Sequence, residues 1–144
     1  MKLSKRSVYG LQAAVRLARR NGSSYLQSRE IAEHEKLPAK FLESILLALR
    51  SAELLESKVG AGGGYRLARP ADQITIAQLL DALDHEEQDV PAEVAETDGQ
   101  FALVAVNERI ESAMSDAIGS LSLTELLELS EEKQQGSRAP MYYI

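Results

Sequence analysis

The stretch that decides the fold runs from residue 26 to residue 69, LQSREIAEHEKLPAKFLESILLALRSAELLESKVGAGGGYRLAR. Residues 28–36 have a helical pattern, and the Ser28 hydroxyl is placed to accept a free backbone N–H of the first turn. Leu37 and Pro38 interrupt this pattern, because proline lacks a backbone donor yet fits the start of a new helix. The stretch therefore predicts two short helices around a tight turn, which is a helix-turn-helix.

The second helix of this unit is expected to lie in the major groove of DNA. Its apolar residues recur at helical spacing and predict a buried face: Leu42, Ile45, Leu46 and Leu49. On the polar side we expect Lys40 to contact phosphate or base edges, and Glu43 to accept a hydrogen bond from a cytosine amino group. Ser44 belongs to the same surface. Phe41 has two interpretations, because its ring could pack on sugar or a thymine methyl, or belong to the core.

Residues 55–59 and 65–68 have the pattern of two strands, and the residues between them form a glycine-rich tip. Glycine adopts positive φ without steric cost and lets the backbone approach a neighbour closely. A helix-turn-helix followed by such a hairpin is a winged helix, whose tip would approach phosphate or enter a minor groove. The wing residues expected to contact DNA are Lys58, Gly60, Ala61, Gly62, Gly63 and Arg66.

At these residues the chain resembles a known family. The segment GAGGGYRL at residues 60–67, the opening MKLS, and ITI at residues 74–76 followed by Leu79 and Leu80 are similar to the Rrf-two family of bacterial transcription regulators. The resemblance extends to about Leu129 and is strongest before Leu83. It implies a winged helix-turn-helix regulator that dimerises through a long C-terminal helix.

The chain also departs from the pattern of that family. Many relatives carry arginine before the first wing glycine, serine at the start of the recognition helix and a turn glycine before Leu54. This chain has Val59, Pro38 and Glu53 at those places, so we expect a different operator. Cluster-binding relatives hold three cysteines in the loop that matches residues 85–100. This chain has no Cys, so that function is not carried over and no cofactor is expected.

Charge is distributed unevenly along the 144 residues, a length that suits one domain. The net charge of −6 alone argues against nucleic acid. Residues 1–70, however, hold 13 Lys and Arg against 6 Asp and Glu, a net charge of +7, and residues 71–144 carry −13. The alternative is an ordinary charged surface, but the basic half coincides with the helix-turn-helix and therefore favours DNA.

The inventory of reactive residues argues against an enzyme. With no Cys and only His34 and His85, thiolate chemistry is excluded and a structural zinc site is not expected. A phosphate-binding loop needs Gly-Lys-Ser/Thr before a helix, whereas these glycines lead into a strand pattern. We assign no catalytic and no metal-binding residue. His85 with the acids around it could be imagined as a metal site, but a solvated acidic loop is the favoured interpretation.

Nothing in the chain has the pattern of a signal peptide or a membrane-spanning segment, so the expected location is the cytoplasm and no membrane partner is expected. At the N-terminal end, Ser4 would cap a first helix that runs to about Arg20. In that helix an apolar face is expected to pack on the helix-turn-helix: Val8, Leu11, Val15 and Ala18.

Two further helix starts follow from capping boxes, in which Ser or Thr and an acid or amide three residues later satisfy each other's backbone N–H groups. Thr75 and Gln78 predict a helix that ends near Asp84. Ser122 and Glu125 predict a second, shorter helix.

A long helix is expected between them, over about residues 102–120. Its apolar residues recur every three or four positions and form the predicted dimerisation stripe: Leu103, Val106, Ile110, Met114, Ala117 and Leu121. The alternative is an ordinary core helix.

These patterns divide the chain into four parts and lead to two hypotheses. The parts are a winged helix-turn-helix over residues 1–84, a mobile acidic loop over 85–100, the dimerisation and short helices over 101–129, and a disordered tail over 130–144. The fold class is mainly α with a small β-hairpin wing. The first hypothesis is a homodimeric regulator, a repressor, that binds double-stranded DNA at a pseudo-palindromic operator. The second is a winged-helix interaction module whose main partner is a protein or a small ligand. An unknown effector or partner protein is compatible with both.

Overall fold

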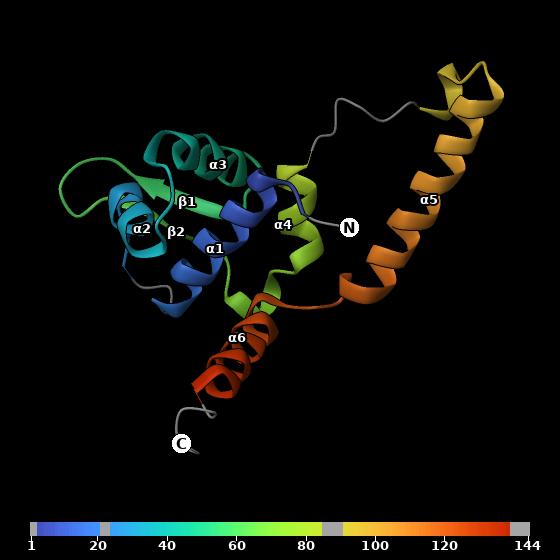
Figure 1. Ribbon diagram of the computed structural model, residues 1–144. Helices are drawn as coiled ribbons and strands as arrows, with labels where there is room; N and C mark the ends of the chain where they lie inside the picture. The colour runs from blue at the N-terminus through green and yellow to red at the C-terminus, as the bar shows by residue number, and fades with distance from the viewer. Residues whose placement is uncertain (1–2, 21–23, 85–90, 139–144) are drawn as a thin grey trace.

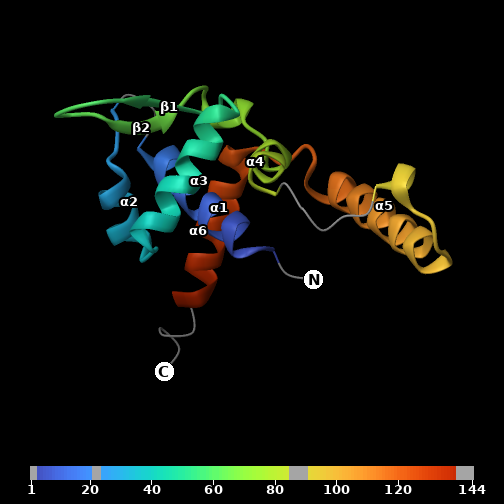
Figure 2. The ribbon, with the colours of Figure 1, turned by 90° about the horizontal axis from the view of Figure 1, so that it is seen from above.

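The computed structural model describes residues 3–20, 24–84 and 91–138 (Figure 1). The elements in chain order are α1 (Lys5–Arg19), α2 (Ser28–Glu35), α3 (Ala39–Ser51), β1 (Leu55–Lys58), β2 (Gly64–Leu67), η1 (Ala71–Gln73), α4 (Ile76–Leu83), η2 (Ala92–Val94), α5 (Asp98–Ile118) and α6 (Leu123–Arg138). Helices α1 to α4, the hairpin and α6 form one body, and α5 extends away from it in both views (Figures 1 and 2). No helix in the described part of the chain is long and apolar enough to cross a bilayer.

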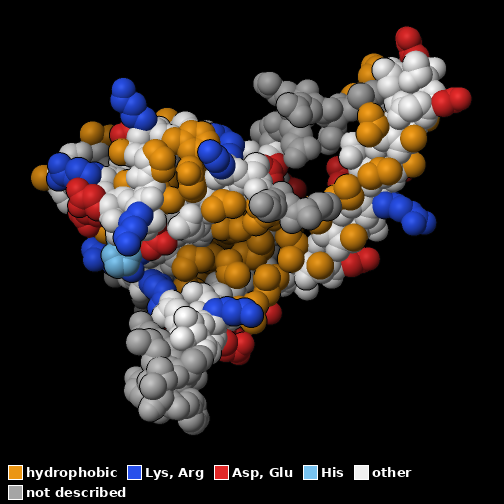
Figure 3. Space-filling model, viewed as in Figure 1, with side chains coloured by type: hydrophobic (Ala, Val, Ile, Leu, Met, Phe, Trp, Pro, Cys, Tyr) orange, Lys and Arg blue, Asp and Glu red, His pale blue; other side chains and the backbone are white. Residues whose placement is uncertain are grey.

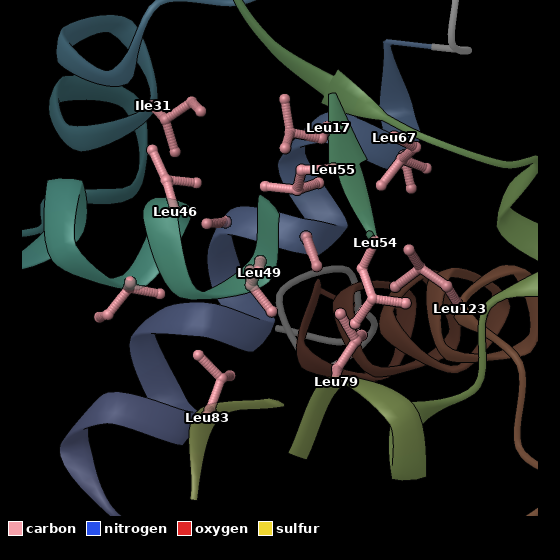
Figure 4. Close-up of a cluster of buried hydrophobic side chains, with 14 of the residues drawn as sticks. Leu17, Ile31, Leu46, Leu49, Leu54, Leu55, Leu67, Leu79, Leu83 and Leu123 are labelled. Carbon is pink, nitrogen blue, oxygen red and sulfur yellow. The ribbon is translucent and has the colours of Figure 1, made fainter. Parts of the chain in front are cut away.

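The core of this body is built mainly from leucines that converge from every element around α3 (Figure 4). The face predicted to be buried in α3 is buried completely, because Leu42, Ile45, Leu46 and Leu49 are each 0% exposed. This packing fixes the rotation of α3 about its axis. The polar residues between these leucines are consequently turned outward.

The turn between α2 and α3 forms as the sequence predicts, with one correction. Lys36 ends α2 in the left-handed conformation at φ 58°, and the Leu37 N–H donates to the Ala32 carbonyl at 2.9 Å. Pro38 is the N-cap of α3. The expected Ser28 cap is wrong, because Gln27 is the N-cap of α2 and no side chain caps that helix. Ser28 is already the first helical residue.

The end of α3 places a side chain where glycine is usually found. Glu53 has φ 62°, its N–H donates to the Arg50 carbonyl at 2.9 Å, and the Leu54 N–H donates to the Leu49 carbonyl at 3.0 Å. This pair of bonds is the Schellman motif, whose left-handed residue pays a steric penalty for its Cβ. It is the position at which relatives in the resembling family carry the turn glycine.

We therefore expect Glu53→Gly to stabilise the fold by about 1 kcal/mol. Chemical denaturation monitored by circular dichroism measures the change. The matched control is Glu33→Gly on the exposed face of α2, where the same replacement should destabilise the fold by about 1 kcal/mol. If both variants were destabilised equally, the backbone at Glu53 would not be strained.

The wing is an antiparallel hairpin in which Leu55 pairs with Leu67 and Lys58 pairs with Gly64. A third segment joins it, since the N–H groups of Leu26 and Tyr65 each donate to the other's carbonyl at 2.8 Å. This pairing is an isolated antiparallel bridge. Gly64 has φ 132° and its Cα faces the backbone of Leu26, so no side chain fits there.

Helix α1 packs through a different face from the expected one. Its buried residues are mostly small: Ser7, Gly10, Ala13, Ala14, Leu17 and Ala18. Of the predicted face only Ala18 is fully buried, whereas Leu11 and Val15 are half-buried and Val8 is 38% exposed. Small residues allow a close approach, because a Cβ at Gly10 would collide with the side chain of Leu83 in α4. The apolar face is therefore left partly open.

The C-terminal half contains the predicted helices but two of its boundaries differ. Helix α5 begins at Asp98, four residues before the expected start, because Thr97 and Gln100 form a capping box there. The acidic loop is therefore shorter than expected, and its residues 85–90 lie outside the described part of the chain. The expected disordered tail is wrong for residues 130–138, which continue α6. Residues 131–135, EEKQQ, are all good helix formers.

Helix α6 returns to the body after α5 has left it. The Leu123 N–H donates to the Ile74 carbonyl and the Ile76 N–H to the Leu121 carbonyl, both at 2.8 Å, and Leu123 is 0% exposed. The Ser122 hydroxyl accepts the Glu125 N–H at 3.1 Å, which confirms the predicted start of this helix. The C-terminal end of α5 is thereby tied to this body.

Candidate nucleic-acid interface

The N-terminal end of α3 and the tip of the wing lie on the same side of the body. The N-terminal end of α3 and the hairpin tip both point away from α5 in the two views (Figures 1 and 2). Lys40 and Glu43 are exposed in the first turns of α3, and Leu47 on the next turn is 48% exposed. This face can therefore enter a groove without unfolding any part of the core.

Two predicted contact residues of α3 already have partners within the chain. The Ser44 hydroxyl donates to the Phe41 carbonyl at 2.9 Å and accepts from the Arg6 guanidinium at 3.4 Å. The Phe41 ring stands edge-on to the Tyr9 ring, with centroids 5.5 Å apart, and Phe41 is 37% exposed. Phe41 thus fastens the start of α3 to α1 and presents only part of its ring to solvent.

The wing tip offers both backbone and side chains to a ligand. Val59 is 96% exposed, and Lys58, Gly60, Ala61 and Gly62 are also exposed. Gly63 differs from the others, because it is buried and its N–H donates to the Gly60 carbonyl at 3.0 Å. Gly63 shapes the tip, while its neighbours Lys58 to Gly62 remain exposed.

Arg66 is held inside the wing. Its Nε donates to the Glu56 carboxylate at 3.0 Å across the strand pair, and its guanidinium lies 4.5 Å from the centre of the Tyr25 ring. The side chain is 33% exposed. Unlike Lys58, this arginine would have to give up an ion pair before it could contact phosphate.

A hollow of about 350 Å³ separates the wing from the start of α2 and was not anticipated from the sequence. It is lined by Gln27, Ser28, Arg29, Gly60, Gly64 and Tyr65. No side chain caps α2, whose first residues line this hollow, so the backbone N–H groups of its first turn have no side-chain acceptor. The exposed Arg29 adds a cation that takes part in no ion pair with the described residues. Such a helix start attracts anions.

Basic side chains gather over the winged helix-turn-helix, whereas α5 carries acidic ones and few basic ones (Figure 3). Basic and acidic residues, which are concentrated in different halves of the sequence, are therefore also separated in space. Most cations of the first half remain available, since the ion pairs found among the described residues hold only Arg19, Arg66 and His34.

Helix α5 contains no fully buried residue. Phe101, Leu103 and Val106 are each more than half exposed, at 53%, 53% and 54%. Figure 3 shows hydrophobic side chains along α5 and over the neighbouring surface of α1 and α4. The stripe predicted from the sequence is split, however. Met114 and Leu121 are partly buried against the chain's own core, as is Ile118, so the open apolar surface lies toward the N-terminal end of α5.

The donor atoms of this chain do not fit an iron–sulfur cluster. Such clusters are held by cysteine thiolates, and the sequence has none. Among residues 3–20, 24–84 and 91–138, no three His, Asp or Glu residues form a group that could hold a metal ion.

Comparison with known proteins agrees with this geometry. Residues 3–129 match the sequence model of the Rrf2 (Rrf-two) family, described as an iron-dependent transcriptional regulator. The chain is 33% identical to the HTH-type transcriptional regulator CymR of Bacillus subtilis over 144 residues, the full length of both proteins. It is 35% identical to the HTH-type regulator IscR of Cereibacter sphaeroides over 86 residues, which cover 58% of this chain and 56% of IscR.

Solved structures show the same similarity. The structure of B. subtilis CymR, described as a global cysteine regulator, matches with a TM-score of 0.70 at 29% identity and covers 90% of this chain and 98% of CymR. The structure of T. potens IscR matches with a TM-score of 0.74 at 29% identity and covers 93% of this chain and 91% of IscR.

Proposed function

The chain belongs to the Rrf2 family of transcriptional regulators, and on that premise we propose that it represses transcription as a homodimer on a pseudo-palindromic operator, without an iron–sulfur cluster. Like its relatives, it is a DNA-binding regulator and not an enzyme. The observation that carries the proposal is that the N-terminal end of α3, with its exposed Lys40 and Glu43, and the wing tip, with its exposed Lys58, both point away from α5.

In the proposed complex the first turns of α3 enter the major groove. Lys40 contacts phosphate or a base edge, and Glu43 accepts a hydrogen bond from a cytosine amino group. The exposed tip residues Gly60, Ala61 and Gly62 bring backbone to the duplex, with Lys58 beside them. The hollow between α2 and the wing adds a phosphate contact through Arg29.

The proposed homodimer forms through the open apolar surface of α5. Pairing with its own copy covers this surface, because a two-fold axis places the same stripe on both sides of the contact. In a symmetric dimer two α3 helices would read half-sites about one helical turn apart. The exposed part of the stripe, Leu103 and Val106, supports this proposal more strongly than Met114 and Leu121, which also contact their own core.

Selection of bound genomic fragments by the purified protein tests the proposed function. Sequence-selective retention that weakens with salt supports a DNA-binding repressor, and a reporter gene under the recovered operator should be silenced by the protein. Retention without sequence preference, or none, would favour the alternative of a winged-helix module whose main partner is a protein or a small ligand.

Glu43→Ala is expected to change sequence preference more than total affinity. A carboxylate is repelled by the phosphates, so its place on the reading face is explained by discrimination between bases. Its removal should relax one base position per half-site by about 1–3 kcal/mol, as measured by selection from random duplexes. Glu108→Ala on α5 removes the same charge far from the duplex and should leave the selected site intact. An unchanged site with unchanged stringency in Glu43→Ala would exclude Glu43 as a reader.

DNA binding is expected to need no iron. Carboxylates and two histidines are poor replacements for the soft thiolate ligands that iron–sulfur clusters prefer. Protein purified without oxygen should therefore show no visible charge-transfer band and no stoichiometric iron, and should bind its operator equally well before and after exposure to air. Stoichiometric iron whose oxidation abolishes DNA binding would contradict the proposal.

A further inference from the structure

A second cleft, of about 820 Å³, lies at the base of the wing, on the side of the hairpin that meets α6. Strand β2 and the segment that follows it form one wall, and the first turns of α6 form another. Its apolar lining comes from three separate parts of the chain and includes Ala18, Leu67, Pro70 and Leu127. The cleft contains none of the exposed residues of α3 or of the wing tip, so the proposed DNA contacts leave it unexplained.

The walls of this cleft are fixed by backbone hydrogen bonds. The Ala68 N–H donates to the Leu54 carbonyl at 3.0 Å, which ties the end of β2 to the end of α3. The Leu123 N–H donates to the Ile74 carbonyl at 2.8 Å, which ties α6 to the segment after η1. The cleft is therefore preformed, as small-molecule sites usually are.

One cation in the cleft has unused hydrogen-bond donors. Arg69 forms no ion pair with the described residues, and its Nη2 makes only a long hydrogen bond of 3.4 Å to the Gln78 side-chain oxygen. That oxygen already accepts the Thr75 N–H at 3.0 Å as part of the capping box. Most N–H groups of the Arg69 guanidinium are thus free to donate, and two of them can bind a planar carboxylate through parallel hydrogen bonds.

The remaining charges of the cleft limit the ligand to a single negative charge. Arg66 is neutralised by Glu56 at 3.0 Å, and Asp72 also lines the cleft. Arg69 is thereby the one cation of the cleft without a carboxylate at ion-pair distance among the described residues, and the lining has no net positive charge, so a phosphate or a dicarboxylate would be repelled more strongly than a single carboxylate. The apolar lining in turn favours a ligand with a short hydrocarbon body.

We propose that this cleft binds a small organic monocarboxylate, with the carboxylate on Arg69 and the hydrocarbon part on the apolar lining. The ligand would contact the strand that carries the wing and the helix that follows α5 in the chain. A role of this ligand as a signal that alters operator binding rests on the function proposed above. The existence of the binding site does not depend on that function.

Butyrate is a suitable probe, with uncharged butyramide as its matched control, and the full chain is titrated without DNA at constant ionic strength. In two-dimensional ¹H–¹⁵N spectra, butyrate should cause saturable shifts confined to amides around the cleft, namely those of Ala18, Glu56 and residues 66–69, 71–72 and 124–127. Butyramide should bind at least about tenfold more weakly, because it lacks the charge-assisted bonds to Arg69. Absence of saturable shifts, or equal binding of the two compounds, would overturn the proposal.

Two variants locate the site. Arg69→Gln is expected to weaken butyrate binding about tenfold, and Ala71→Leu, which fills part of the cleft and leaves Arg69 in place, should weaken it as well. Arg50→Gln on α3 removes an arginine outside the cleft and should have no effect. Unchanged binding in Arg69→Gln would place the carboxylate elsewhere. Because no DNA is present, failure of this test is distinguishable from failure of the proposed DNA-binding function.

Discussion

The affinity for operator DNA is expected to fall about 10³-fold when the salt concentration rises from about 50 mM to about 200 mM. The net charge of residues 1–70 is +7 in each subunit, and most of these cations have no carboxylate partner among the described residues. When they contact phosphates, they release condensed counterions, and salt opposes that release. Some six or more phosphate contacts per dimer are needed for this slope.

A salt titration by fluorescence anisotropy with a labelled operator measures this slope. Lys58→Gln should make the slope of log affinity against log salt shallower by about 2 per dimer, because each subunit loses one phosphate contact. Lys133→Gln on α6 removes the same charge outside the proposed interface and should leave the slope unchanged. An affinity that stays flat across this range would exclude a phosphate-dominated interface.

The second large effect is expected from Val106→Glu, which should weaken dimerisation about 10³-fold. Val106 is 54% exposed in the single chain, so the substitution places no charge in the monomer's own core. In the proposed dimer the same position is covered by the partner's α5, where two glutamates related by the two-fold axis would be desolvated and would repel each other. The residues of the stripe are all uncharged, and the nearest cation along the helix is the exposed Arg109, three residues from position 106.

Sedimentation equilibrium measures the loss of the dimer, and circular dichroism checks that the monomer remains folded. Ser112→Glu is the matched control, because it adds one carboxylate to an exposed position on the opposite side of α5. The control should stay dimeric, while Val106→Glu should also lose affinity for a two-half-site operator. An intact dimer in Val106→Glu would move the interface away from this part of α5.

Much of the fold follows from the sequence, because the relevant signals are local. The spacing of Leu42, Ile45, Leu46 and Leu49 predicts the buried face of α3, and Thr75 with Gln78 predicts the start of α4 through bonds between residues three apart. The glycines of the wing predict its tip, since left-handed backbone favours glycine. Even the missed start of α5 was present in the sequence, as the pair Thr97 and Gln100.

The family and its DNA-binding function were also predicted from the ordered motifs, since the spacing of those motifs reflects one fold. Local sequence patterns predicted the wrong structure where two conformations of a segment are close in free energy. Residues 130–138 are polar enough for a solvated tail, yet they continue a helix whose first turns are anchored by the buried Leu123. A helix that is already nucleated extends readily through good helix formers.

Only the tertiary structure decided which charged and aromatic side chains remain available. Arg66 and Lys58 look equivalent in the sequence, but the strand register brings Glu56 beside Arg66 and leaves Lys58 free. Phe41 meets Tyr9 only because α1 crosses the start of α3. Likewise the cleft that contains Arg69 exists because α6 returns to the base of the wing, more than fifty residues further along the chain. Contacts between residues distant in sequence depend on how the elements pack, and local patterns carry no record of that packing.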